Sequence, residues 1–506
     1  MSNWQPSPLE EQRLSKLGKL EDAGIEPYPI KSSRSHTTAE VKELFVQLEE
    51  ASEDVASQVS VCGRLLSIRD MGKTVFAHLE DGEGRIQLFL RRDEIGEDSH
   101  QYFRKLVDLG DFIEAIGVPF RTRAGEISIR VSGWRLLSKS ISPLPVVKEQ
   151  QVEGETVRYS AFADVEERYR QRYADLAVNP EIREVFRIRA KIISALRVFF
   201  DENGFLEVET PIMQPLYGGA AARPFTTYHN QLKQDLYLRI SFELYLKRLL
   251  VGGYERVYEI GRDFRNEGVD AVHNPEFTQL EFYAAYWDYL DVMEFTERML
   301  LRVVESVLGT PVISYQGKEI DFSKTWRRMT LREAILKYSE IDYMEHRSAA
   351  ELASAITQIG GHVQKGATWG KLIDGLLGEF VEPRLIEPTF IIEYPRDISP
   401  LAKGVPGDPL HVERFEFFIA GMEMGNAFSE LNDPLEQQRR FEEMQRLYQS
   451  DDVEAHPIDE DYLRAMRYGM PPNGGFGMGV DRLTMLITDK TTIREVLLYP
   501  HLRQRE

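Results

Sequence analysis

The chain has 506 residues, of which 42% are hydrophobic, so it has room for two or three globular domains and is too apolar to be disordered. Its net charge of −20 argues against unspecific nucleic-acid binding, which relies on Lys and Arg neutralising phosphates. A single cysteine, Cys62, excludes an intrachain disulfide and a cysteine-pair zinc site. We find no secretory signal and no apolar run of about 18 residues, so we expect no membrane contact and a cytoplasmic location.

Residues 1–58 predict a helical extension. Leu14, Leu17 and Leu20 recur at helical spacing, and a second helical stretch runs from about residue 38 to residue 52. Neither stretch carries a recognisable chemical motif.

The pattern changes to strands over residues 59–145. Alternating runs begin at Val59, Thr74 and Arg85, and about five short strands in about 80 residues predict a small closed barrel such as an oligonucleotide-binding fold. Residues 61–150 carry 14 Lys+Arg and 13 Asp+Glu, so this part is weakly basic on an acidic chain. That balance permits local nucleic-acid binding, and an ordinary barrel without a ligand fits the pattern equally well.

The rest of the chain predicts a linker and one large domain. Residues 146–165 follow a proline-containing stretch and show few periodic apolar positions, so we interpret them as the linker. Residues 166–506 predict a mixed α+β domain, with a helical subdomain inserted at about 324–390.

The first informative segment of this domain is a long helix. Asn179 is a good N-cap, Gly204 ends the apolar stripe, and a strand runs from Phe205 to Pro211. A stripe of this length fits a core helix, and it fits packing against a second copy of itself equally well.

The second segment is a pair of strands around Phe264-Arg265-Asn266-Glu267. The second strand has a period of two, which places Phe277, Gln279, Glu281 and Tyr283 on one face. An aromatic ring, a carboxylate and a phenol are unusual together in a core, and they suit a floor that stacks a base and holds an ammonium group. For Arg265 taken alone, a structural salt bridge is the simpler explanation.

The third segment combines alternating glycines with the start of a helix. Gly475, Gly477 and Gly479 leave one strand face without side chains, and Asp481 and Arg482 follow. A bare face lets a flat ligand lie on the backbone, although a bulge or tight strand packing gives the same pattern. No Gly-Lys-Ser/Thr follows, so this is not a P-loop.

The fourth segment contains two glutamates on either side of a turn. Gly421 allows a hairpin, which we expect to bring Glu416 and Glu423 across from each other. Two such carboxylates suit a hard divalent cation that bridges phosphates. A solvated pair on an antiparallel ribbon is the alternative.

Together, the four segments resemble the class II aminoacyl-tRNA synthetases. The helix and strand up to Pro211 are similar to motif 1, Phe264–Glu267 to motif 2, and Gly477–Arg482 to motif 3, in the order that the class shows. Within this class the chain resembles the lysyl-tRNA synthetases over nearly its full length. The strings that carry this closer resemblance include Gly218-Gly-Ala-Ala-Ala-Arg-Pro-Phe, His273-Asn-Pro-Glu-Phe and Asn426-Ala-Phe-Ser-Glu-Leu-Asn-Asp.

The resemblance implies a fold and a reaction. It implies an antiparallel sheet of six to seven strands flanked by helices, an N-terminal barrel that binds the anticodon, and a homodimer built on motif 1. The implied reaction is the activation of L-lysine by ATP to lysyl-adenylate, followed by transfer to tRNA(Lys), with Mg²⁺ and without zinc.

It also implies particular site residues. The catalytic groups are Arg265 and Arg482. The expected ATP site comprises Arg265, Glu267, His273, Asn274, Phe277, Glu416 and Arg482. The expected lysine site comprises Gly218, Gly219, Glu243, Glu281, Tyr283, Asn426 and Glu430. Glu416 and Glu423 are the expected metal ligands, and Arg69, Phe76 and Gln87 the expected anticodon contacts.

Three alternatives remain at this level. A synthetase of the same fold specific for asparagine or aspartate is disfavoured by Glu430 and by the Gly218-Gly219-Ala220 string. A protein-lysylating paralogue resembles the catalytic domain alone, whereas this chain has the barrel. A non-catalytic RNA-binding paralogue is disfavoured by the retained arginines and glutamates of the expected ATP site.

Overall fold

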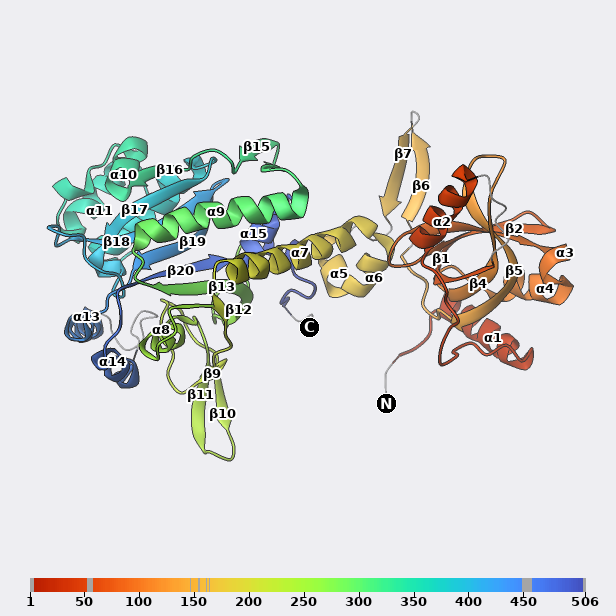
Figure 1. Ribbon diagram of the computed structural model, residues 1–506, viewed down its shortest axis with the longest axis horizontal. Coiled ribbons are helices and arrows are strands. Elements are labelled where there is room, and N and C mark those ends of the chain that lie inside the picture. The colour runs from red at the N-terminus through yellow and green to blue at the C-terminus, as the bar shows by residue number, and fades with distance from the viewer. Residues whose placement is uncertain are drawn as a thin grey trace. The chain divides into compact units, whose positions relative to one another are not determined.

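The computed structural model describes residues 4–51, 58–145, 147–152, 155–160, 162, 164–447 and 457–503. The chain divides into two compact units, Met1–Val178 and Asn179–Glu506 (Figure 1). In the described part of the chain, no helix is long and apolar enough to cross a membrane.

The first unit is built on a five-stranded barrel, which confirms the predicted fold. The strands close in the order β1-β2-β3-β5-β4. Alternate residues of each strand point inward, and those of β2 and β3 form much of the barrel core. The strands are β1 (Val59–Asp70), β2 (Thr74–Glu80), β3 (Arg85–Arg91), β4 (Phe112–Arg121) and β5 (Ile127–Ser138).

Four helices accompany the barrel. The first two begin at capping boxes, Ser7 with Glu10 and Thr37 with Glu40, which satisfy the free amide groups of the first turn. Leu20 from the first helix joins the barrel core. The helices are α1 (Pro8–Asp22), α2 (Thr38–Glu50), α3 (Arg92–Ile95) and α4 (Glu97–Leu106).

The segment predicted as a linker, residues 146–165, contains an antiparallel strand pair. β6 (Val147–Val152) pairs with β7 (Glu155–Ser160). Two short helices follow, α5 (Val165–Arg170) and α6 (Arg172–Val178). The segment is rich in polar residues, so the sequence lacks the apolar alternation that usually reveals a strand.

The second unit is built on an eight-stranded sheet in the order β16-β17-β18-β19-β20-β13-β12-β8. The six inner strands are antiparallel, as expected, while the edge strands β8 and β16 pair in parallel and extend the sheet beyond the expected size. The strands are β8 (Leu206–Glu207), β12 (Arg256–Phe264), β13 (Glu276–Ala285), β16 (Arg327–Thr330), β17 (Thr389–Pro395), β18 (His411–Ile419), β19 (Met422–Ser429) and β20 (Asn473–Gly479).

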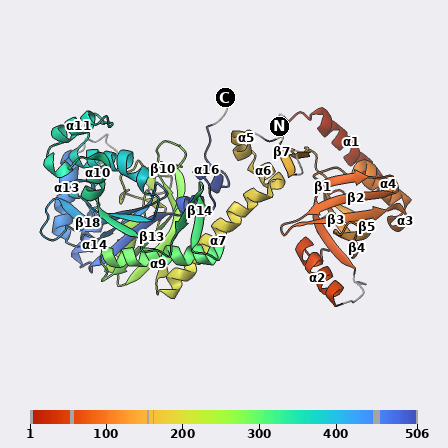
Figure 2. The same ribbon diagram turned by 90° about the horizontal axis from the view of Figure 1, so that it is seen from above.

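Two long helices cover one face of this sheet (Figures 1 and 2). α7 (Pro180–Glu202) and α9 (Tyr289–Leu308) bury their apolar stripes against Leu280 and Phe282 of β13. Gly204, with a φ of +74°, lets the chain turn after α7, as the sequence predicts. The outer helices α15 (Val480–Ile487) and α16 (Ile493–Val496) follow β20 directly.

Among the remaining elements, α8 (Glu243–Val251), α12 (Trp369–Leu376) and α13 (Pro434–Leu447) carry side chains that line the site. The predicted insertion at 324–390 begins and ends in sheet strands β16 and β17, and its helices have a hydrophobic core of their own. The other helices are α10 (Leu331–Ser339), α11 (Ala349–Gln358) and α14 (Glu460–Arg467). The small strands are β9 (Met213–Gln214), β10 (Thr226–His229), β11 (Gln234–Leu238), β14 (Val312–Tyr315) and β15 (Lys318–Asp321).

Candidate active site

A single row of residues crosses the sheet. Register pairs Glu259 with Glu281, Glu281 with Gly477, Gly477 with Asn426, and Asn426 with Glu416. Directly opposed residues of neighbouring strands point to the same side, so this row faces away from the α7–α9 core. Of this row, Glu281, Gly477 and Asn426 form the floor of the site, as the predicted alternation of β13 requires for Glu281.

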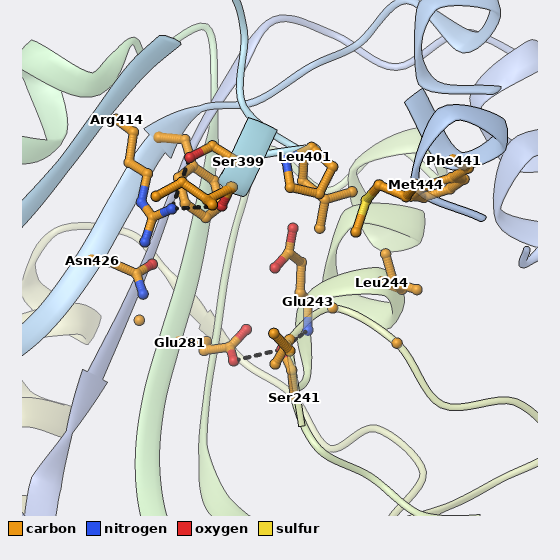
Figure 3. A pocket seen from close by; sticks show the side chains of 18 of the residues that line it. Ser241, Glu243, Leu244, Glu281, Ser399, Leu401, Arg414, Asn426, Phe441 and Met444 are labelled. Atoms are coloured by element: carbon orange, nitrogen blue, oxygen red, sulfur yellow. Dashed lines mark hydrogen bonds between the residues drawn. The ribbon is translucent and has the colours of Figure 1, made fainter. Parts of the chain in front are cut away.

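A main cavity of about 330 Å³ lies over this floor (Figure 3). The carboxylates of Glu243 and Glu281 point into it, and Arg414 and Asn426 lie on the opposite wall. The cavity brings together these predicted residues: Gly218, Gly219, Glu243, Arg265, Glu281, Tyr283 and Asn426.

A second cavity of about 190 Å³ adjoins the first, and Arg265, Gln279, Asn426 and Gly477 line both. It brings together the predicted ATP-site residues Arg265, His273, Asn274, Phe277 and Arg482 with the predicted metal ligand Glu423. Arg265, His273 and Asn274 come from the loop after β12, and Arg482 comes from the first turn of α15. The segments similar to motifs 2 and 3, which are distant in sequence, therefore meet at one place.

Arg265 occupies the boundary between the cavities. Its guanidinium lies 5.0 Å from the centre of the Phe277 ring, and its Nε donates to the carbonyl of Ile240 at 3.4 Å. Among the described residues Arg265 forms no salt bridge, so the simpler explanation offered by the sequence does not hold. Its remaining N–H groups are available to an anionic ligand.

Arg482 is held in place at the far end of the second cavity. Its Nη1 donates to the carbonyl oxygen of Glu423 at 2.5 Å and lies 3.2 Å from the carboxylate of the same residue. Nη2 approaches Nε2 of His273 at 3.4 Å. Asp481, beside it, accepts from the Thr278 amide and pairs with Arg189 of α7, which fixes the start of α15.

The two predicted metal ligands are not opposite each other, which corrects the sequence prediction. Glu423 faces Phe418 because the turn pairs Ile419 with Met422, and a bulge beside Phe417 shifts the register further, so that Glu416 faces Asn426. The predicted turn is present at Gly421, with a φ of +77°. The pairing at the turn and the bulge both depend on the partner strand, so the apolar pattern of the sequence does not reveal them.

Glu416 is buried and lies outside the lining of both cavities. It accepts hydrogen bonds from the Tyr394 hydroxyl at 2.9 Å and from Arg414 Nη2 at 2.5 Å. Burial raises the pKa of Glu416 to about 8, Arg414 opposes this rise, and Glu423 adds to it. A cation close to these carboxylates would relieve the cost of burying them.

The donor set of Glu416 and Glu423 suits a hard cation in part. Among the described residues no group of three or more His, Cys, Asp or Glu side chains is arranged to hold a metal. Two carboxylates fit Mg²⁺ when phosphate oxygens and water complete the octahedron, which is its usual mode at a nucleotide.

Glu267 is a second predicted ATP-site residue that lies outside both cavities. It is exposed in the loop after β12. Strand β12 ends at Phe264, so Arg265 and Glu267 lie in the loop and not on a strand face.

Glu281 is the centre of a hydrogen-bond network at the floor of the main cavity. It accepts from Ser241 Oγ at 2.9 Å, Gln279 Nε2 at 3.0 Å, the Tyr283 hydroxyl at 3.2 Å and the Phe242 amide at 3.4 Å. Burial, aided by neighbouring carboxylates, raises its pKa well above the usual range. These donors orient the carboxylate toward a cation in the cavity.

Glu430 lies behind the cavity lining and is 1% exposed. Its carboxylate is paired with the ammonium of Lys247, a fully buried residue that also pairs with Glu243. A methyl group on Gly475 would collide with Glu430 and with the Tyr283 ring. The bare face of β20 therefore makes room for protein side chains at this position, and not for a ligand as the sequence suggested.

Sequence reasoning missed several residues at the site. Lys247 was overlooked because Glu and Lys four positions apart on a helix are usually an exposed pair. Gln279 could have been found, since it shares a strand face with Glu281. Other polar lining residues that carry no sequence signal are Ser241, Asp374, Ser399 and Arg414.

The predicted anticodon contacts lie on the outer surface of the barrel. Arg69 is directly opposite Phe76, whose ring lies 5.1 Å from that of Phe89 on β3. Phe120 continues the row at 5.6 Å from Phe89. Gln87, on the same strand as Phe89, donates to a carboxylate oxygen of Glu126 at 2.7 Å. Aromatic faces beside amide groups suit single-stranded nucleic acid.

Comparison with protein families agrees with this arrangement. The family described as "tRNA synthetases class II (D, K and N)" matches residues 164–503, and the family described as "OB-fold nucleic acid binding domain" matches residues 59–137. Fold and site thus define an aminoacyl-tRNA synthetase of class II.

Similar proteins indicate to which family within this class the chain belongs. The lysine–tRNA ligase of Roseiflexus sp. (strain RS-1) is 51% identical over 499 residues, 98% of this chain and 99% of the relative. That of Chloroflexus aurantiacus is 51% identical over 98% of both chains, and that of Carboxydothermus hydrogenoformans 47% identical over the whole of both. The chain belongs to the lysine–tRNA ligase family. These relatives support lysine over the aspartate and asparagine alternatives.

Proposed function

We propose that this protein activates L-lysine with ATP to form lysyl-adenylate and pyrophosphate, and then transfers the lysyl group to tRNA(Lys). The observation that carries the proposal is the pair of adjoining cavities that share Arg265. One is lined by buried carboxylates and the other by arginines and an aromatic ring, so Arg265 lies where an amino acid and a nucleotide would meet.

Lysine fits the main cavity through its two ammonium groups. Glu243 and the backbone at Gly218 and Gly219, which line this cavity, would bind the α-ammonium. Glu281 and Tyr283 lie deeper in the floor, where they and Glu430 would receive the side-chain ammonium, with Asn426 in support. A neutral side chain would leave buried carboxylates unpaired, which accounts for selectivity.

ATP fits the second cavity. Phe277 offers a face for the adenine, and His273 and Asn274 lie beside it, with Glu267 as a more distant contact from the loop. Arg265 would bind the α-phosphate and Arg482 the γ-phosphate, because a guanidinium presents paired donors to phosphate oxygens. Holding the lysine carboxylate and the α-phosphate in line is the main catalytic task.

Charge stabilisation at the phosphates involves more than the arginines. Glu416 and Glu423 would hold Mg²⁺, which when bound offsets the negative charge of the phosphates. Arg265 then stabilises the charge that builds up on the α-phosphate as the lysine carboxylate approaches. The pyrophosphate leaves toward Arg482.

We further propose that the barrel reads the tRNA anticodon, with Phe76 stacking on a base and Arg69 and Gln87 contacting base edges. A homodimer is proposed because exposed apolar side chains occur on α7 and near β9, among them Val198, Ile212 and Met213. As tRNA charging serves translation, we place the protein in the cytoplasm.

The direct test is ATP–pyrophosphate exchange measured with each of the twenty amino acids. We expect exchange with lysine alone, and Arg265→Ala should reduce it by at least about 1,000-fold, since arginine clamps on phosphoryl groups commonly contribute this much. Arg347→Ala, an exposed arginine of the insertion, is the matched control. Near-normal exchange in Arg265→Ala, or exchange with another amino acid, would contradict the proposal.

A further inference from the structure

A buried ammonium of the protein itself lies beside the proposed lysine site. Lys247 follows Glu243 by one turn of α8 and is fully buried. Its Nζ is paired with the carboxylates of Glu243 and Glu430 and lies 5.7 Å from the centre of the Tyr283 ring. Glu243 lines the main cavity, whereas Glu430 lies behind it, so Lys247 connects the cavity wall to the carboxylate behind the wall.

The carboxylate of Glu430 has an ion-pair partner but lacks hydrogen-bond donors in the described part of the chain. Its Oε2 forms an ion pair with the Lys247 ammonium, neither oxygen has a hydrogen-bond partner among the described residues, and Oε1 packs at Gly475. A buried oxygen without a partner costs about 1–3 kcal/mol, so its persistence in a folded protein calls for a ligand. The adjacent Tyr283 lines the cavity, which places Oε1 next to the proposed position of the substrate's side-chain ammonium.

We propose that Lys247 is a positioning residue for lysine recognition: its ammonium holds Glu430 in the ionised state before the amino acid arrives, so that Oε1 is ready to accept the substrate's side-chain ammonium. This inference rests on the proposed function. It adds the Lys247 ammonium to a proposed lysine site whose other charged groups are carboxylates.

The groups around the pair support this assignment. They come from three elements: Glu243 on α8, Glu281 and Tyr283 on β13, and Tyr462 on α14, beside which Arg248 pairs with Asp459. The carboxylates and phenols among them do not favour an ionised Glu430. Burial raises the pKa of Glu430, and the Lys247 ammonium opposes that rise. Removing Lys247 would therefore raise the pKa of Glu430 further and favour its protonated form.

A proton on Glu430 has a measurable consequence. The substrate's ammonium would have to displace that proton, so lysine binding would weaken about tenfold for each pH unit below the pKa of the protonated glutamate. A proton-carrying Glu430 would also no longer penalise a neutral side chain such as that of norleucine.

The experiment measures the KM for lysine in pyrophosphate exchange between about pH 6.5 and pH 8.5. In the wild-type protein we expect a KM that is nearly flat over this range. In Lys247→Met we expect a KM raised at least about tenfold at the acid end that falls as pH rises, with the KM for ATP and kcat changed less than about threefold. The selectivity for lysine over norleucine should fall in parallel.

Adding Glu430→Gln to Lys247→Met removes the titrating group. The double variant should keep a high KM for lysine that no longer depends on pH. A pH dependence that survives in the double variant would overturn the inference, and so would a uniform rise of KM at every pH in Lys247→Met.

Lys139→Met is the matched control, because Lys139 is an equally buried lysine with two carboxylate partners in the barrel. It should lower stability and leave the KM for lysine unchanged at every pH. If Lys247→Met does not fold, Lys247→Arg takes its place: it retains the cation, so its KM must stay flat with pH, and a KM that rises toward acid contradicts the inference. Absence of lysine-dependent exchange in the wild-type protein would instead contradict the proposed function.

Discussion

Each unit of the molecule contains a buried lysine paired with two carboxylates, and the two arrangements differ in one respect. In the barrel, Lys139 pairs with Asp108 at 2.6 Å and Asp111 at 2.8 Å, and both Asp111 oxygens also accept backbone hydrogen bonds. In the second unit, Lys247 pairs with Glu243 and Glu430, and an oxygen of Glu430 has no hydrogen-bond partner among the described residues.

This difference separates a structural ion pair from one prepared for a ligand. A buried ion pair gains little net free energy, because desolvation offsets the attraction, unless every donor and acceptor is satisfied. In the barrel, the protein's own groups satisfy the donors and acceptors of the ion pair. In the second unit, acceptors of Glu430 stay without a hydrogen-bond donor from the described residues beside the cavity, where a cationic substrate would supply one.

The largest expected effect comes from neutralising one acid in each unit. Glu430→Gln should lower kcat/KM for lysine about 100-fold, since breaking a close buried charge pair costs about 3 kcal/mol. Asp111→Asn should lower the thermal stability of the barrel and leave pyrophosphate exchange intact. Equal losses of exchange in the two variants would contradict the distinction between a structural ion pair in the barrel and a ligand-binding one in the second unit.

A smaller effect should follow from filling the space beside Glu430. Gly475→Ala introduces a methyl group that collides with Glu430 and Tyr283, and overpacking of this kind costs about 1–3 kcal/mol. We expect the KM for lysine to rise about tenfold and the KM for ATP to change less than about twofold. Gly133→Ala in β5, where a methyl group meets no atom within 4 Å, is the control. A parallel rise of both KM values would indicate general misfolding.

The barrel should show the smallest effect, and in a different assay. Phe76→Ala removes one stacking face, which is worth about 1–3 kcal/mol per base, so charging at limiting tRNA should fall about tenfold while pyrophosphate exchange is spared. Phe112→Ala, whose ring lies under Arg64, serves as the control in the same barrel. If exchange and charging fell equally in Phe76→Ala, the barrel would not be the anticodon reader.

Sequence periodicity was sufficient for much of the fold. The alternation of β13 separates Phe282, in the core, from Glu281, in the site, and the structure agrees. Capping and glycine positions likewise located α7. These features are local, because each residue's environment follows from its own strand or helix.

Features that depend on distant partners could not be predicted. The turn pairing and the bulge that set Glu416 apart from Glu423 depend on how two strands pair, and the strand pair β6–β7 has no apolar pattern. Lys247 was missed because burial decides whether a Glu–Lys spacing is a surface pair or part of a site, and burial depends on β13 and α14.

Gly475 connects these observations to the evolution of specificity. Glu430 fits behind the cavity because this backbone position has no side chain. A methyl group at position 475 would therefore displace the Glu430 carboxylate, even if residue 475 itself does not touch the amino acid. Engineers who wish to recruit this scaffold for an uncharged or unnatural amino acid have a starting point in the glycine strand, and the acids that line the cavity can be left for later rounds.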